Sequence, residues 1–176
     1  MSERKDYICA DQSERLIQLL APNANQQRVT TVFDLGAGRG DLLAAAGLRW
    51  PTAQLYAVDI DGANVRAMQA RLPKAYCINA DALQYDLPHR LGLDEDSADI
   101  AVANPPYGAL QSETDALKLL RHVGLADVVS HKRVNWEIVF LAQNLRLLRT
   151  GGALVAIVPE GLGSCIHFGE LRAALM

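Results

Sequence analysis

The residues best suited to chemistry in this sequence are Asn104, Pro105, Pro106 and Tyr107, which follow an apolar run over residues 98–103. Such a run is typical of a buried strand. Proline has a fixed φ angle and no N–H to donate, so the Asn104 side chain and the Pro105 carbonyl can be held in a set geometry beside an aromatic ring. Two acceptors next to a ring suit a planar amine. Asn-Pro-Pro is also a common turn signal, so this interpretation depends on the surrounding sequence.

A second candidate site is the glycine-rich segment with Gly36, Gly38 and Gly40, which follows Asp34 in a predicted strand over residues 31–35. Glycine has no Cβ and tolerates positive φ, so a ligand can approach this backbone closely. The third glycine comes one residue earlier than in the Gly-x-Gly-x-x-Gly fingerprint of dinucleotide-binding proteins. The spacing makes NAD a minor alternative, and a tight turn that binds no ligand is the other interpretation.

Two more acidic residues follow later predicted strands. Asp59 comes after residues 54–58, and its two acceptor oxygens suit the diol of a ribose. Asp81 follows a short predicted strand over residues 76–78 and is placed to accept a hydrogen bond from the amino group of an adenine. An Asp after a strand is also a common cap or turn residue. Because the carboxyl ends of parallel strands meet at one edge of a sheet, the motifs together indicate a single ligand site.

The elements that must position these residues alternate between strand and helix. Helices are expected over residues 11–20, 41–46, 62–72, 136–148 and 167–176, and strands over residues 31–35, 54–58, 76–78, 98–103 and 153–158. Gly151 and Gly152 are expected to form the turn before the last strand. This alternation predicts an α/β fold with a doubly wound, mostly parallel sheet. The polar segment 108–135, directly after Tyr107, is predicted to be a mobile flap over the site.

Length and composition limit the class of protein. A chain of 176 residues, 50% hydrophobic and 21% charged, has the size and balance of one globular domain. The polar N-terminus and the short apolar runs predict a cytoplasmic protein that does not enter the membrane. The net charge of −3 provides no overall basic field, so a nucleic-acid substrate would need much of its binding surface elsewhere.

Cysteine and histidine spacing predicts neither a disulfide framework nor a metal site. The cysteines are far apart and form no Cys-x-x-Cys pair, and the histidines lack the spacing of metal ligands. These residues are Cys9, Cys77 and Cys165, and His89, His122, His131 and His167.

Taken in order, the motifs resemble the class I S-adenosylmethionine-dependent methyltransferases, and Asn104 to Tyr107 make the chain most similar to the adenine-N6 DNA methyltransferases of restriction-modification systems. The resemblance covers nearly the whole chain. It implies a Rossmann-like fold and S-adenosylmethionine as the cofactor, with glycines beside the methionine part, Asp34 near its ammonium group, and Asp59 at the ribose. The cofactor-binding residues that it implies are Asp34, Gly36, Gly38, Asp59, Ile60, Asp81, Ala82 and Asn104.

The resemblance also implies a catalytic role for residues 104–107. The amino nitrogen of adenine is a poor nucleophile because its lone pair is delocalised into the ring. The Asn104 side-chain oxygen and the Pro105 carbonyl would accept the two amino hydrogens and stabilise the positive charge that develops on nitrogen. Tyr107 would stack on an adenine flipped out of double-stranded DNA, so its ring should matter more than its hydroxyl.

Other substrates are open alternatives, as is a non-catalytic or incomplete methyltransferase subunit that needs a partner chain. The glutamine-N5 methyltransferases that modify release factors share Asn-Pro-Pro-Tyr, and adenine in RNA would suit the same residues. Enzymes of this fold also close their sheet with a strand hairpin, and those acting on DNA carry a target recognition domain. Neither fits within residues 1–176. We therefore expect a catalytic domain that is incomplete at its C-terminus, with a partner chain or a further domain for target recognition.

Overall fold

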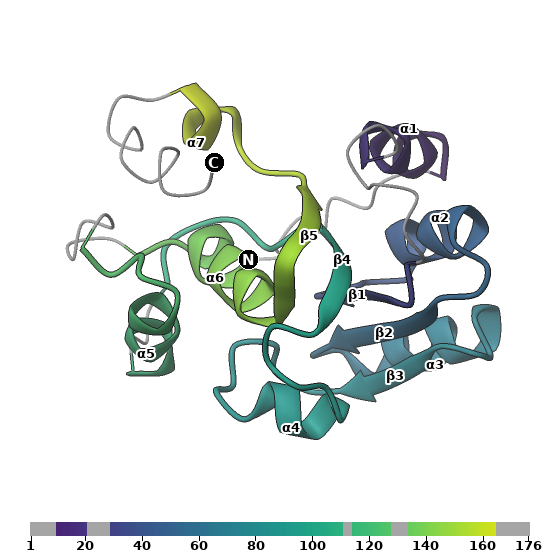
Figure 1. Ribbon diagram of the computed structural model, residues 1–176, viewed down its shortest axis with the longest axis horizontal. Helices are drawn as coiled ribbons and strands as arrows, with labels where there is room; N and C mark the ends of the chain where they lie inside the picture. Colours follow the sequence, from purple (N-terminus) through teal and green to yellow (C-terminus); the bar gives the residue numbers. More distant parts are fainter. Residues whose placement is uncertain (1–9, 21–28, 111–113, 128–133, 165–176) are drawn as a thin grey trace.

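A parallel five-stranded sheet with the order β3-β2-β1-β4-β5 organises the chain (Figure 1). The computed structural model describes residues 10–20, 29–110, 114–127 and 134–164. The strands are β1 (Thr31–Leu35), β2 (Gln54–Asp59), β3 (Tyr76–Asn79), β4 (Ala98–Ala103) and β5 (Leu148–Ala156). The helices are α1 (Ala10–Leu20), α2 (Asp41–Arg49), α3 (Gly62–Arg71), α4 (Leu87–Leu91), α5 (Thr114–His122), α6 (Trp136–Leu147) and α7 (Glu160–Ser164). The expected doubly wound, mostly parallel fold is confirmed.

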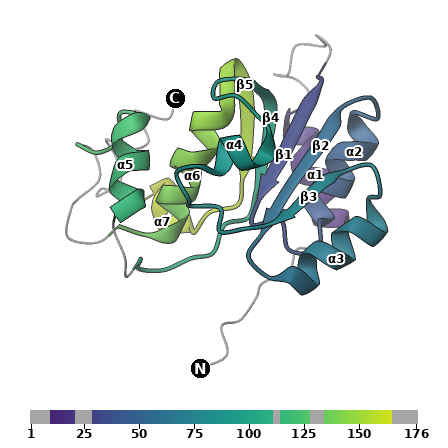
Figure 2. The ribbon, with the colours of Figure 1, turned by 90° about the horizontal axis from the view of Figure 1, so that it is seen from below.

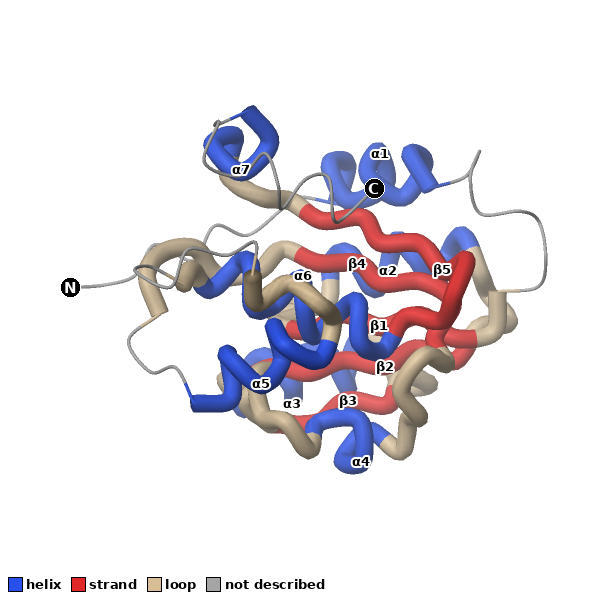
Figure 3. Tube along the Cα trace, turned by 60° about the vertical axis from the view of Figure 1, so that its left-hand side comes forward, coloured by secondary structure: helices blue, strands red, loops and turns tan. Residues whose placement is uncertain are grey.

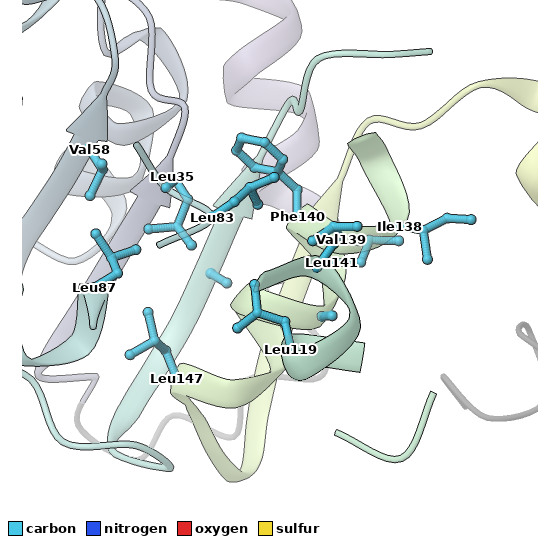
Figure 4. Close-up of a cluster of buried hydrophobic side chains, with 14 of the residues drawn as sticks. Leu35, Val58, Leu83, Leu87, Leu119, Ile138, Val139, Phe140, Leu141 and Leu147 are labelled. Atoms are coloured by element: carbon cyan, nitrogen blue, oxygen red, sulfur yellow. The ribbon is translucent and has the colours of Figure 1, made fainter. Parts of the chain in front are cut away.

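Helices cover both faces of the sheet. Figure 2 shows α1, α2 and α3 on one side and α4, α5 and α6 on the other, and the tube in Figure 3 shows the strands between them. The side chains of β1 alternate between the two cores: Val32 belongs to the cluster on the α1–α3 side, while Phe33 and Leu35 belong to the cluster on the α4–α6 side. Figure 4 shows the second cluster, in which Phe140 and Leu119 come from α6 and α5. Burial on both faces explains the continuous apolar runs of the strands.

The last strand begins earlier than its sequence predicts. The turn expected at Gly151 and Gly152 is an irregularity inside β5, because Leu148 pairs with Ala98 and Ala153 pairs with Ile100. A Cβ on Gly152 would lie 2.9 Å from the carbonyl oxygen of Arg149 and 3.0 Å from that of Asp99. Only glycine allows this close approach, so the bulge depends on it.

The segment after Tyr107 is also different from the predicted flap. Residues 114–122 form α5, and Leu119, Leu120 and Leu125 are buried in the core shared with α6. A helix packed through leucines is part of the domain core, so the flap prediction is wrong for residues 114–127. The rest of that segment, 111–113 and 128–133, and the helix expected over residues 167–176 lie outside the described residues.

Asp99 ties the amino ends of β1, β4 and β5 together, at the edge of the sheet opposite the predicted site. Its Oδ2 accepts hydrogen bonds from Thr30 N and Thr30 Oγ1 at 2.8 Å and from Thr31 N at 3.0 Å, and its Oδ1 accepts one from Arg149 Nε at 2.7 Å. Burial alone would raise the pKa of Asp99, but these donors together outweigh it and the pKa is lowered. This carboxylate therefore stabilises the sheet in its ionised form.

None of the described helices is long and apolar enough to cross a membrane.

Candidate active site at the carboxyl edge of the sheet

The register of the sheet brings the predicted site residues to one edge. Asp34 in β1 is paired with Val102 in β4, so Gly36 and Asn104 leave neighbouring strands at the same level. On the other side of β1, Leu35 is paired with Val58, which puts Asp59 at that level too. The chain crosses from β3 back to β4 beside β1, and this change of direction makes the edge between β1 and β4 a topological switch point. Ligands of open α/β sheets bind at such points.

The glycine loop between β1 and α2 is held against β2. Gly36 N and Ala37 N both donate to Val58 O, at 2.8 and 2.9 Å. Gly36 has a φ of +79°, and a Cβ there would lie 3.2 Å from Cε1 of the Phe140 ring. Glycine is thus required at this position for both its backbone conformation and its close contact with α6. The loop passes over Phe140 without a side chain of its own in between.

Asp34 lies beneath this loop and is 2% exposed. Its Oδ1 is buried and accepts no hydrogen bond from the described residues. Burial, and to a smaller extent the charge of Asp59, raise the pKa of Asp34 well above its usual value. A positively charged ligand group next to this carboxyl would stabilise its ionised form. The unsatisfied oxygen therefore fits a cationic ligand.

Asp59 links the end of β2 to the glycine loop. Its Oδ2 accepts a hydrogen bond from Gly38 N at 2.7 Å, and its Oδ1 accepts from Asp61 N at 2.8 Å and from Asn64 Nδ2 at 3.2 Å. The residue is 7% exposed. A carboxylate has about four lone-pair sites, so capacity for a further donor remains. The predicted contact with a ribose stays a prediction, and the structure adds a role for Asp59 in shaping the loop.

Asn79 braces the turn that follows β2 and was missed by sequence reasoning. Its Nδ2 donates to Asp59 O and Ile60 O, both at 2.9 Å. Ile60 is 75% exposed. The brace sets the position of Ile60, so this apolar surface is available to cover a ligand. A polar residue ending β3 opposite Asp59 was the only signal in the sequence.

The loop after β3 carries Asp81 and Ala82. Asp81 Oδ1 accepts a hydrogen bond from Leu83 N at 2.9 Å, which forms a tight local turn. Its Oδ2 has no partner among the described residues. Ala82 is buried, and its carbonyl oxygen accepts from Gln143 Nε2 at 2.9 Å, as does that of Gln84 at 3.0 Å. One oxygen of Asp81 is therefore left for a ligand while α6 holds the loop.

Asn104 and Tyr107 contact each other at the end of β4. The Tyr107 hydroxyl lies 3.0 Å from Asn104 Oδ1 and 3.2 Å from Ile157 O, at the end of β5. Pro105 is buried and Pro106 is exposed, and Tyr107 is 43% exposed. A hydroxyl has one hydrogen, so it donates to one of these oxygens at a time. The aromatic ring is therefore fixed near the amide while keeping surface available for a substrate.

Helix α6 carries buried polar side chains that contact the loops on both sides of the site. These residues, Glu137, Gln143 and Arg146, break the otherwise apolar pattern of the helix, as does Asn144, whose Nδ2 donates to Phe140 O within α6. Arg146 Nη1 donates to Tyr85 O at 2.7 Å in the loop after β3. Buried polar groups of this kind are expected to have partners, but the sequence does not say which. The sequence therefore shows which positions of α6 carry polar residues among apolar ones, but not which groups those residues contact.

Among the described residues, no group of three or more His, Cys, Asp or Glu side chains is arranged to hold a metal ion. Cys77 is a free, buried thiol, and burial raises its pKa. Cys9, Cys165, His131 and His167 lie outside the described residues.

Residues 8–166 match the model of the methyltransferase small domain family. The chain belongs to this family. It is 27% identical to ribosomal RNA large subunit methyltransferase G of Shewanella amazonensis over 158 residues, which cover 80% of this chain and 40% of that protein. It is 26% identical to a trans-aconitate 2-methyltransferase of Escherichia coli over 117 residues, 66% of this chain and 42% of that protein. This methyltransferase small domain thus spans about two fifths of the length of these two relatives.

A shorter match connects the domain to a type II methyltransferase. Type II methyltransferase M.BsuBI of Bacillus subtilis is 32% identical over 76 residues, 43% of this chain and 14% of that protein. Among solved structures, geranyl diphosphate C-methyltransferase from Streptomyces coelicolor, in complex with S-adenosyl-L-homocysteine, has a TM-score of 0.53 at 16% identity. The superposed region covers 84% of this chain and 42% of the geranyl diphosphate C-methyltransferase chain. At this identity the likeness shows the fold alone.

These comparisons confirm the coarser part of the sequence prediction. The chain has the Rossmann-like methyltransferase fold, and S-adenosylmethionine is the cofactor of its family. The described residues fit that group, because the unsatisfied, buried Asp34 Oδ1 suits a positively charged ligand and the glycine loop offers backbone without a side chain. The adenine-N6 DNA family is not confirmed.

Proposed function

We propose that this methyltransferase small domain transfers a methyl group from S-adenosylmethionine to the exocyclic amino group of a nucleobase, with adenine in DNA as the first target to test. The observation that carries the proposal is the pair Asn104 and Tyr107, an amide oxygen 3.0 Å from an aromatic hydroxyl at the end of β4. The pair lies at the same sheet edge as the glycine loop. Amide acceptor, aromatic surface and cofactor loop are the parts that an amine methyltransferase needs.

Residues 104–107, called the amine clamp below, would prepare the nucleophile. Asn104 Oδ1 and the Pro105 carbonyl oxygen accept the two hydrogens of the amino group, which draws the nitrogen lone pair out of the ring system. The same oxygens stabilise the positive charge that forms as nitrogen gains the methyl group and the carbon–sulfur bond breaks. The nitrogen then releases one proton to solvent. Tyr107 stacks on the base and compensates part of the cost of flipping it out of a duplex.

The cofactor half of the site is formed by the loops after β1, β2 and β3. When bound, S-adenosylmethionine supplies an activated methyl group next to the amine clamp. In this proposal Asp34, which is buried, would hold its ammonium group, and Gly36 and Gly38 would pass along its methionine part. Asp59, which already accepts from Gly38 N, would accept hydrogen bonds from its ribose. Ile60, Asp81 and Ala82 are proposed to contact the adenine ring, since an exposed apolar side chain and an acceptor oxygen lie there. Asn104 would lie where the two halves meet.

A base in ribosomal RNA is the second candidate substrate. The ribosomal RNA methyltransferase relative matches 80% of this chain, whereas the type II methyltransferase relative matches 43%. The amine clamp suits an exocyclic amine in either nucleic acid, because it reads the nitrogen and the ring face rather than the sugar. Recognition of the sugar and of the surrounding sequence would come from other surfaces.

Target recognition is proposed to reside in a further domain or a partner chain. The relatives are longer than the region matched here, and the net charge of −3 gives this chain no general attraction to phosphates. A separate basic surface would supply that attraction.

The test offers methyl-labelled S-adenosylmethionine and a panel of acceptors to the purified chain and to cells that express it. The panel contains duplex DNA, ribosomal RNA and a glutamine-containing peptide, and nucleosides or peptides are then analysed by mass spectrometry. N6-methyladenine in DNA is the expected product, and a methylated amino group in ribosomal RNA would support the second candidate. Label in the peptide alone, or on a ring carbon of a base, would overturn the proposal.

A further inference from the structure

We propose that Glu137 is a positioning residue for the amine clamp: its buried carboxylate holds the peptide bond that follows Tyr107 and thereby sets the orientation of the tyrosine ring. The proposal rests on the function proposed above. Glu137 belongs to the first turn of α6, and no motif in the sequence pointed to this residue.

The carboxylate of Glu137 is buried and makes two contacts. Its Oε2 accepts a hydrogen bond from Gly108 N at 3.2 Å, and its Oε1 accepts one from Asn135 Nδ2 at 3.0 Å. The residue is 4% exposed. Charged side chains with so little exposure are rare in proteins unless they are paired. The chain thus keeps a carboxylate in a position where a neutral or apolar side chain would be easier to bury.

The location of Glu137 in its helix makes that burial tolerable. Glu137 is the second residue of α6, and Asn135 is the N-cap. The first turn of a helix has free N–H groups and a partial positive charge, which together stabilise a carboxylate. The helix therefore supplies the electrostatic environment, and the direction of the Glu137 side chain decides what the carboxylate holds.

The atom held is part of the amine clamp. Gly108 N belongs to the peptide bond whose carbonyl is that of Tyr107, so a hydrogen bond to this N–H limits rotation about the Tyr107 backbone. Gly108 has a φ of +116°, and the chain turns there directly after the ring. Without an acceptor for this N–H, the turn would have greater freedom, and the Tyr107 hydroxyl would leave Asn104 Oδ1 more readily.

Backbone contacts hold the same segment to the start of α6. Trp136 N donates to Gly108 O and Leu110 N donates to Val134 O, both at 2.9 Å, and Ala109 and Asn135 form an antiparallel bridge. These bonds position the strand-like segment after the clamp as a whole. The Glu137 carboxylate accepts from the first backbone N–H after Tyr107, so it adds control over the ring itself.

The experiment compares the wild type with Glu137→Gln and with the double variant Asn135→Asp plus Glu137→Gln. In the single variant, the amide of Gln at position 137 has only one acceptor oxygen. Its NH₂ group therefore faces a second donor, either Asn135 Nδ2 or Gly108 N, unless the Asn135 amide flips. In the double variant, the carboxylate at position 135 can accept from the amide at position 137, whose oxygen can accept from Gly108 N. The double variant keeps the wild-type charge, so it should restore the arrangement if that arrangement is what matters.

Three readouts separate positioning from general stability: amide hydrogen exchange over residues 107–110, the Kd for S-adenosylmethionine, and kcat and KM for whichever acceptor the wild type methylates. We expect Glu137→Gln to speed exchange at Gly108 and lower kcat by about 10- to 100-fold, because small displacements of catalytic groups have effects of this size. The Kd for the cofactor should change less than about twofold, because changes at sites without shared partners have largely independent effects. The double variant should recover most of both losses.

Gln143→Leu serves as the matched control, because Gln143 is equally buried on α6 but contacts Ala82 O and Gln84 O instead. It should leave exchange at Gly108 unchanged and weaken cofactor binding. The inference is overturned if Glu137→Gln leaves exchange and kcat unchanged, or if it lowers cofactor affinity and turnover together without rescue. If the wild type methylates no acceptor in the panel, the proposed function fails, and the exchange measurements alone decide whether Glu137 holds Tyr107.

Discussion

The Tyr107 hydroxyl donates toward Asn104 Oδ1 across 3.0 Å, so the aromatic and amide parts of the amine clamp are connected before any substrate arrives. A carbonyl oxygen has two lone pairs. The tyrosine contact therefore does not by itself exclude a hydrogen bond from a substrate amine to the same oxygen. The hydroxyl orients the amide, while the exposed part of the ring remains available for stacking.

Replacing Asn104 by Ala should abolish most methyl transfer. The variant loses one of the two acceptors that draw out the nitrogen lone pair, and removal of one such electrostatic contact typically costs about 10²–10³-fold in kcat. Binding of S-adenosylmethionine should survive, because the glycine loop and Asp59 keep their contacts with each other. Calorimetry with the cofactor, next to single-turnover methyl transfer, tests both parts. Turnover at the wild-type rate would exclude the proposed role of the amide.

The two parts of Tyr107 can be separated by Tyr107→Phe and Tyr107→Ala. The first removes the hydroxyl contacts with Asn104 Oδ1 and Ile157 O, and a neutral hydrogen bond of this kind contributes about 1 kcal/mol, or roughly fivefold in rate. The second also removes the stacking surface, worth roughly 1–3 kcal/mol per base. KM for the acceptor should therefore rise much more in Tyr107→Ala. Equal losses in the two variants would assign the function to the hydroxyl alone.

Asp34→Asn should stabilise the free chain near neutral pH and weaken cofactor binding. Burial, then the Asp59 charge, raise the pKa of Asp34, so the folded state holds a proton that the unfolded state releases above about pH 3.8, its usual value. Raising the pH through that window lowers wild-type stability, and the variant escapes this loss. The missing charge should reduce affinity for S-adenosylmethionine by about 10-fold or more, since hydrogen bonds to charged groups are worth ~1.5–3 kcal/mol.

Urea unfolding across pH and calorimetry check this prediction, with Asp41→Asn as the control. Asp41 also loses a negative charge in that variant, but it forms a surface ion pair with Arg71 at 2.5 Å, and such pairs contribute little. If Asp34→Asn behaves like the control in both measurements, the buried carboxyl has no special relation to the cofactor.

Gly36→Ala should disturb the cofactor loop, and Gly124→Ala provides the comparison. Both glycines have a left-handed backbone, with φ of +79° and +73°, and an added Cβ costs roughly 1–2 kcal/mol there. The Cβ at position 124 would meet no atom within 4 Å, whereas that at position 36 would lie 3.2 Å from Phe140. Only Gly36→Ala should therefore also reduce cofactor affinity. Equal effects on unfolding and unchanged cofactor binding in both variants would show that the contact with Phe140 is unimportant.

The parts of the site that follow strands could be predicted from the sequence. Residues 98–103 are a continuous apolar run because β4 is buried on both faces, and the polar motif begins where the strand ends. The same reasoning located β1 and β2 and the acidic residue associated with each. Parallel sheets place such ends together, so one rule brought distant motifs to one edge.

The contacts that hold these motifs could not be predicted. Gln143 reaches Ala82 across 61 positions of sequence, and no local pattern pairs them. Gly152 resembled a turn residue because its packing against the carbonyls of Asp99 and Ala98 depends on the neighbouring strand. The segment that contains α5 looked polar because polar residues surround its few leucines. Those leucines are buried only because they pack against α6 in the folded chain. Local preference was overridden in each case by contacts formed in the folded chain.

Asp99 should make the stability of the sheet depend on acid. Burial raises its pKa, but hydrogen bonds from Thr30, Arg149 and Thr31 outweigh that effect, so the folded pKa is below the usual value of 3.8. As the pH falls, the unfolded chain takes up the proton first, so the stabilisation is lost progressively from the unfolded pKa down to the folded pKa. Asp99→Asn should therefore be less stable than wild type by an amount that is constant near neutral pH and shrinks below about pH 4. Chemical denaturation of both proteins across this range measures the difference, and a gap that widens on acidification would contradict the assignment.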